Sequence, residues 1–205
     1  MKNNTYILIT GSKENAGDFL IKRRSIELLS TLRPDRDIYL HNSWEAFNKS
    51  SIELINNSRA ILLAGGPSLQ TNMYPEIYKL SKNINEIKVP IITLGIGGKN
   101  HNYLNDSCKN YLLNKSSLRL LHKINNSGFQ SSVRDNLTLK ILEEKGFHNF
   151  INTGCPALFT NNKNNDFHQK PKSICFSLGV SYKYSKKMFF QMKNIMIFLK
   201  STYDL

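Results

Sequence analysis

The sequence has few acidic residues and few cysteines, and each shortage excludes a class of protein. Only 15 Asp and Glu stand against 28 Lys and Arg, and the net charge of +13 favours anionic partners. Cys108, Cys155 and Cys175 form no Cys-x-x-Cys pair, so neither a disulfide framework nor a zinc site is indicated, and a reducing cytoplasm fits. No His-x-x-x-His or carboxylate cluster indicates a metal, and we expect none.

Long apolar runs are absent as well. The apolar run at residues 6–10 is too short for the core of a signal peptide. The late apolar segment 188–199 contains polar residues and is shorter than the roughly 20 residues that a membrane-spanning helix needs. No RRM signature or zinc-finger spacing accompanies the positive charge, so we expect no nucleic-acid partner. We therefore expect a cytoplasmic protein with at most peripheral contact at the inner face of the membrane.

The composition of the chain and the position of a polar segment predict its domains. A hydrophobic fraction of 40% is enough for a packed core without metals or disulfides. Asn and Lys recur through residues 161–172, which is typical of a surface linker. We expect an α/β domain at 1–160, this linker, and at 173–205 the first βα unit of an incomplete second domain, with a strand at 173–178 and a helix at 186–201. One βα unit cannot bury its own apolar face, so we expect it either to pack onto the first domain or to belong to a longer two-domain protein.

Short β-branched runs alternate with helical patterns through the first domain. This alternation predicts a Rossmann-like, doubly wound and mostly parallel sheet. Asp18 is the expected N-cap of the first helix, and Gly146 is expected to follow the end of the last one. The expected strands are 6–10, 37–41, 60–64, 91–95, 130–133 and 150–153. The expected helices are 19–32, 44–56, 76–85, 107–124 and 136–145.

Glycine-containing loops follow three of these strands. The first, from Gly11 to Asp18, leads into a helix whose N-terminus favours an anion, although it lacks the middle glycine of a dinucleotide fingerprint. Ligands of open α/β sheets bind at the carboxyl ends of the strands, although such glycines also serve ordinary turns. The candidate substrate-binding residues in these loops are Asn15, Gly17, Asp18, Gly65, Gly66 and Gly97.

Arg134 ends the fifth strand at the same edge. Its guanidinium can bind a carboxylate or phosphate through two hydrogen bonds, so it is the foremost candidate for ligand binding. The next residue, Asp135, is expected to pair with Arg134 or to cap the following helix. Cys155 has no base beside it in the sequence and is expected to pack rather than react. Asp18 and His101 are the candidate acid or base residues of this edge.

Five short motifs follow one another along the chain, and their order and spacing are specific. The set resembles the polysaccharide pyruvyl transferases, over residues 6–178. The motifs are Asn15-Ala16-Gly17-Asp18, Gly65-Gly66-Pro67-Ser68, Gly95-Ile96-Gly97, Ser132-Val133-Arg134-Asp135 and Gly154-Cys155-Pro156-Ala157.

This resemblance implies a fold like the N-terminal half of the two-domain GT-B glycosyltransferases. It also implies transfer of a pyruvyl group from phosphoenolpyruvate, a donor substrate rather than a cofactor, to a sugar of a surface polysaccharide or its lipid-linked precursor, as in exopolysaccharide biosynthesis. The product would be a ketal. Family members usually have a complete second domain, so we expect this chain, as a truncated member, to be inactive alone. The alternatives are a GT-B glycosyltransferase using a nucleotide sugar and a non-catalytic binding module. The acceptor glycan and the oligomeric state stay open.

Overall fold

The computed structural model describes residues 4–11, 14–99, 108, 110–160 and 185–203. The chain divides into two compact units, Met1–Asn161 and Asn162–Leu205. In the second unit the described residues form helix α5 (Lys186–Tyr203), which confirms the helix predicted at 186–201. The predicted linker and the predicted strand at 173–178 lie outside the described residues. None of the described helices combines the length and the apolarity needed to cross a membrane.

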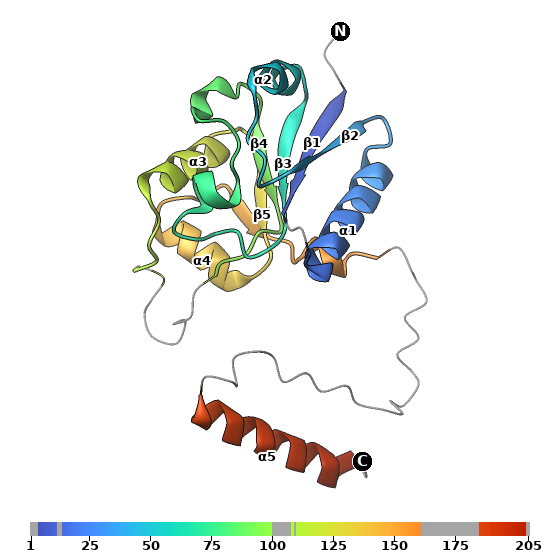
Figure 1. Cartoon of the computed structure of the whole chain (residues 1–205), viewed down its shortest axis with the longest axis vertical. Helices are drawn as coiled ribbons and strands as arrows, with labels where there is room; N and C mark the ends of the chain where they lie inside the picture. The colour runs from blue at the N-terminus through green and yellow to red at the C-terminus, as the bar shows by residue number, and fades with distance from the viewer. Residues whose placement is uncertain (1–3, 12–13, 100–107, 109, 161–184, 204–205) are drawn as a thin grey trace. The chain divides into compact units, whose positions relative to one another are not determined.

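The first unit is built on short parallel strands (Figure 1). Four of them form a sheet in the order β2-β1-β3-β4, and β5 pairs with β6. Each predicted strand is confirmed to within one residue at either end. The strands are β1 (Thr5–Thr10), β2 (Asp37–Asn42), β3 (Ala60–Ala64), β4 (Ile91–Leu94), β5 (Ser131–Val133) and β6 (Phe150–Asn152).

Hydrogen bonds join the β5-β6 pair to strand β4. The Thr93 hydroxyl donates to the Ser132 carbonyl at 2.8 Å, and the Gly95 amide donates to the Ser132 hydroxyl at 2.8 Å. An isolated parallel bridge pairs Ile96 with Val133. All of the strand pairs are parallel, so the carboxyl ends of the described strands meet at one edge. This carboxyl edge carries every glycine loop identified in the sequence.

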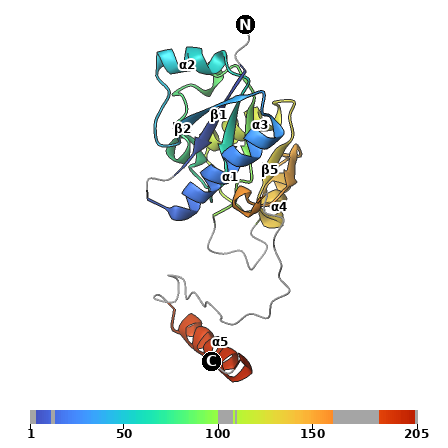
Figure 2. The same ribbon diagram turned by 90° about the vertical axis from the view of Figure 1, so that its right-hand side faces the viewer.

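Helices cover both faces of the sheet (Figures 1 and 2). Successive residues of a strand point to opposite faces, so Ile7 and Ile9 join one apolar cluster while Leu8 joins another. The cluster around Leu8 includes Ile21 of helix α1, and the larger one includes side chains of α2, α3 and α4. This arrangement confirms the Rossmann-like, doubly wound α/β fold. The helices are α1 (Ala16–Leu32), α2 (Lys49–Asn56), α3 (Lys115–Asn125) and α4 (Asn136–Glu144).

Asparagine side chains set the starts of three helices. The Asn15 side chain accepts a hydrogen bond from the Gly17 amide at 2.9 Å, so α1 begins before Asp18 and the prediction of Asp18 as N-cap is wrong. Asn48 and Asn114 cap α2 and α3 in the same way. The predictions of helices at 44–56 and 107–124 therefore placed the starts of α2 and α3 too early in the sequence. The helix predicted at 136–145 is confirmed as α4.

The helix predicted at 76–85 is wrong, and the chain there is irregular. Two short turns replace it, η1 (Met73–Ile77) and η2 (Ile84–Glu86). Between them the backbone bonds to the loop after β2: the Lys79 amide donates to the Ser43 carbonyl at 2.9 Å, and the Leu80 carbonyl accepts from the Phe47 amide at 2.7 Å. These bonds replace the helical ones. The irregular path buries Tyr78 beneath the carboxyl edge.

Candidate functional site

The loops that follow β3 and β4 are joined into one backbone surface at the carboxyl edge. The Gly97 amide donates to the Gly66 carbonyl at 2.8 Å, and the Leu69 amide donates to the Gly97 carbonyl at 2.9 Å. The Tyr111 hydroxyl also donates to the Leu69 carbonyl and thereby fixes the loop after β3. Two of the three glycine loops predicted from the sequence thus act as one structural unit.

Arg134 lies directly against Gly97. A Cβ atom placed on Gly97 would overlap Nε and Cζ of Arg134 and would lie 2.7 Å from its Cδ. The Arg134 amide donates to the Ile96 carbonyl at 2.9 Å, which aligns the end of β5 with the loop after β4. Only a residue without a side chain leaves room for the guanidinium at this place. The structure therefore brings together two predicted site residues that are far apart in the sequence.

The Arg134 guanidinium is held on one side and open on the other. Its Nε lies 3.4 Å from Oδ2 of Asp135, and the side chain is 32% exposed. Within the described part of the chain, the guanidinium makes no other ion pair or hydrogen bond. Its two Nη groups are thus available to a planar anion, which a guanidinium binds through parallel hydrogen bonds.

Asp135 serves both of the structural roles predicted for it. Its Oδ2 pairs with Arg134, and its Oδ1 accepts from the Thr138 amide at 2.7 Å as the N-cap of α4. The Thr138 hydroxyl donates to Oδ1 at 2.8 Å and accepts from the Gly98 amide at 2.8 Å. One network therefore connects the loop after β4, the start of α4 and the carboxylate that orients Arg134.

Asp18 lies at the other end of this edge, in the first turn of α1. A Cβ atom placed on Gly66 would lie 3.5 Å from Oδ1 of Asp18. Gly66 has a φ of +72°, a conformation that glycine adopts without strain. Asp18, Gly66, Gly97 and Arg134 thus follow one another along the carboxyl edge. We call these four residues the edge row.

The first amides of α1 already have partners. The Gly17 amide donates to the Asn15 side chain, and the Asp18 amide donates to the Asn15 carbonyl at 3.1 Å. The Phe19 amide donates to the same carbonyl at 3.2 Å. Asn15 and Gly17 therefore form the helix cap. These three amides are therefore not free for an anion, unlike the Nη groups of Arg134.

Two residues near Asp18 have no role in the sequence-based prediction. Burial raises the pKa of the Tyr78 phenol to about 12. The nearby Ser68 hydroxyl lowers this pKa, and the negative charge of Asp18 raises it further. The buried Ser68 hydroxyl lies beside the phenol but makes no hydrogen bond of normal geometry. Ser68 ends the Gly-Gly-Pro-Ser motif, and this motif was the feature of the sequence that could have identified Ser68 as a site residue. Tyr78 was hidden because its segment was predicted as a helix.

The remaining candidate residues lie elsewhere or have structural contacts. His101 lies outside the described residues. Cys155 packs in the cluster on the α1 face, as predicted. Within the described ranges, no three His, Cys, Asp or Glu side chains gather as metal ligands would.

The sequence matches a known protein family. The model of a family described as "Polysaccharide pyruvyl transferase" matches residues 15–200. The matched region covers most of the chain and includes the whole edge row. No curated protein and no solved structure matches the chain.

Proposed function

We propose that the carboxyl edge of this chain binds phosphoenolpyruvate as the donor of a pyruvyl group. The chain belongs to the polysaccharide pyruvyl transferase family. The observation that carries this proposal is the Arg134 guanidinium, which lies against Gly97 with its Nη groups unpaired within the described residues. Phosphoenolpyruvate carries a carboxylate and a phosphate close together. A guanidinium is suited to bind either group through two hydrogen bonds.

The acceptor is proposed to be a sugar of a polysaccharide that offers two hydroxyl groups. In the reaction, C3 of the enol gains a proton and C2 forms bonds to both hydroxyl oxygens. The bond from C2 to the phosphate oxygen breaks, and the phosphate leaves with its electron pair. Of the two protons that the hydroxyls lose, one balances the proton gained by C3 and the other balances the phosphate. The product is a cyclic ketal.

This chemistry requires a base, an acid and a group that stabilises negative charge. Arg134 is proposed to stabilise the charge of the donor. Asp18 is the proposed base for an acceptor hydroxyl, because its half-buried carboxylate faces Gly66 at the other end of the edge row. His101 remains the second proposed acid or base, on the basis of its sequence position after the Gly97-Gly98 loop.

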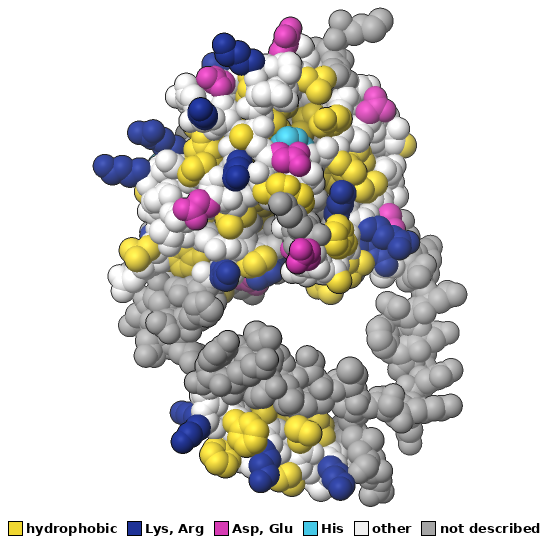
Figure 3. All heavy atoms as spheres, viewed as in Figure 1, with side chains coloured by type: hydrophobic (Ala, Val, Ile, Leu, Met, Phe, Trp, Pro, Cys, Tyr) yellow, Lys and Arg dark blue, Asp and Glu magenta, His cyan; other side chains and the backbone are white. Residues whose placement is uncertain are grey.

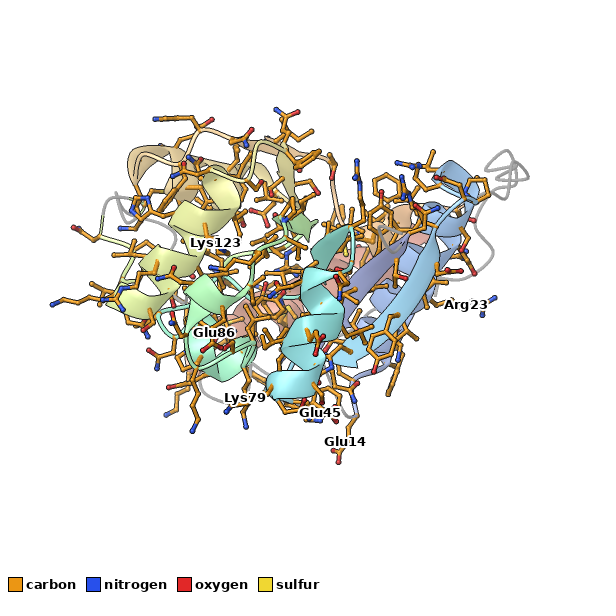
Figure 4. The ribbon with its side chains drawn as sticks, turned by 90° about the horizontal axis from the view of Figure 1, so that it is seen from above. Glu14, Arg23, Glu45, Lys79, Glu86 and Lys123 are labelled. Carbon is orange, nitrogen blue, oxygen red and sulfur yellow. The ribbon has the colours of Figure 1, made fainter. Side chains whose placement is uncertain are left out.

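Calorimetric titration of phosphoenolpyruvate into the chain and two variants tests the proposal. We expect saturable binding that Arg134→Ala weakens about tenfold or more, because a hydrogen-bonded charge contact is lost. Arg23→Ala is the matched control, since Arg23 also pairs with a carboxylate through Nε, at 2.9 Å to Glu27, but lies exposed on α1. Figure 4 labels Arg23 on the outside of the molecule.

A nucleotide sugar in a parallel titration separates the alternatives. Binding of the nucleotide sugar in place of phosphoenolpyruvate would indicate a glycosyltransferase. Binding of neither would favour a non-catalytic module. An equal loss of phosphoenolpyruvate affinity in Arg134→Ala and Arg23→Ala would mean that the positive charge acts nonspecifically, and would contradict the proposed donor site.

A further inference from the structure

A groove of about 640 Å³ opens at the edge of the sheet opposite the edge row. Val89 and Pro90, which lead into β4, line one part of it, and Asn126 and Ser127, which lie between α3 and β5, line another. Residues that precede parallel strands lie at their amino ends, so this groove is separate from the site of Arg134. In Figure 4 the labelled Lys123 marks the α3 side of the groove, and Glu86 marks the neighbouring turn η2.

Positive charge dominates the groove. Lys88, Arg119, His122 and Lys123 line it, and no Asp or Glu does. Within the described residues, the side chains of Arg119 and Lys123 form no ion pair or hydrogen bond, and the Lys88 ammonium donates only to the Asn85 carbonyl, at 2.8 Å. In Figure 3, Lys and Arg side chains project from the left-hand side of the first unit. Two lysines and one arginine therefore line the groove without a counterion from the lining.

Neither a neighbouring carboxylate nor the dipole of α3 accounts for the positive charge of the groove. The acidic residue nearest in sequence, Glu86, accepts a hydrogen bond from the Ser81 hydroxyl at 2.5 Å and does not line the groove. His122 and Lys123 lie in the last turn of α3, where they interact favourably with the helix dipole. That effect does not account for Lys88, which comes from another element and whose charge helps to lower the pKa of Lys123, after the larger effect of burial.

We propose that this groove binds the phosphate or diphosphate group of a ligand. The guanidinium of Arg119 can bind a phosphate through two parallel hydrogen bonds, and the ammonium groups of Lys88 and Lys123 can attract its negative charge. Ile84, Val89 and Pro90 offer apolar surface to the organic part of the ligand. The volume of about 640 Å³ falls within the range of roughly 300–1,000 Å³ that small-molecule sites occupy. The chain would then bind anions at both edges of its sheet.

Titration of pyrophosphate into the Arg134→Ala protein tests this proposal independently of the donor site. We expect saturable binding that the double change Arg119→Gln and Lys123→Gln weakens about tenfold or more. The control is Lys115→Gln, because this exposed lysine lies on the same helix but does not line the groove. Amide chemical shifts of Lys88 and Ser127 should move on binding, and the melting temperature should not change in the variants.

Vesicles of phosphatidylglycerol and phosphatidylcholine distinguish the source of the phosphate group. Vesicle binding that pyrophosphate displaces and that the double variant loses would identify a lipid headgroup. Pyrophosphate binding without vesicle binding would identify a soluble phosphorylated ligand. Absence of saturable pyrophosphate binding, or an equal loss in Lys115→Gln, would overturn the groove proposal and leave the donor site of Arg134 untouched.

Discussion

Gly97→Ala should displace the Arg134 side chain while leaving the fold intact. The added Cβ would overlap Nε and Cζ, which belong to the movable end of a long side chain. Gly97 is not among the glycines with positive φ, so alanine fits its backbone conformation. The guanidinium must therefore leave its place against the loop, and the proposed bidentate contact with phosphoenolpyruvate should be lost.

The expected effects on affinity and on stability differ in size. Loss of a hydrogen bond to a charged group costs about 1.5–3 kcal/mol, which is about tenfold to a hundredfold in the dissociation constant. The Arg134–Asp135 pair is 32% and 43% exposed, and such pairs contribute at most about 1 kcal/mol to folding. Replacing glycine by alanine in a compatible conformation returns about 0.4–1 kcal/mol. The free energy of unfolding should thus hardly change.

Gly95→Ala is the matched control for a glycine that the fold requires. Gly95 has a φ of +65°, and an added Cβ would lie 2.6 Å from the Gly154 carbonyl oxygen and 2.5 Å from Cδ of Pro156. The neighbouring backbone and the proline ring cannot rotate away as an arginine can. We expect this change to destabilise the protein by more than about 1 kcal/mol.

Phosphoenolpyruvate titration and thermal unfolding would be measured on both variants, together with the NMR signal of the Arg134 Nε–H. We expect the Nε–H signal to shift in Gly97→Ala, and the double variant with Arg134→Ala to bind no more weakly than Arg134→Ala alone. Wild-type affinity for phosphoenolpyruvate in Gly97→Ala, or a melting temperature as low as that of Gly95→Ala, would contradict this expectation.

Two further predictions concern stability. Asp135→Ala should lower the free energy of unfolding in urea by about 1 kcal/mol because the cap on Thr138 is lost, whereas Asp135→Asn should retain most of it. Because burial raises the pKa of Tyr78 to about 12, the neutral phenol stabilises the fold by about 2–3 kcal/mol below pH 10, and this contribution is lost as the pH rises through 12. Tyr78→Phe should lack this alkaline loss; an unchanged pH profile would contradict the assignment.

The strands, and the gathering of their following loops at one edge, were predictable because local signals determine them. Short β-branched runs followed by glycine identify buried parallel strands, and parallel strands place their following loops at one edge. The contact between Gly97 and Arg134 was not predictable, because it depends on β4 and β5 becoming neighbours. Tyr78 was missed because apolar residues at 77, 80, 84 and 87 imitate a helical repeat, while the Lys79 amide and the Leu80 carbonyl bond to the loop after β2.

The Thr138 hydroxyl gives the edge a mechanical property. It accepts from Gly98 and donates to Asp135, so one side chain ties a loop, a helix start and the orientation of Arg134 to a common point. A rotation of α4 would therefore carry the loop of Gly98 and the Asp135 carboxylate together. The arrangement of the backbone around Arg134 is fixed during folding, before any ligand arrives. Only the end of the arginine side chain is then left to adjust to the shape of an anion.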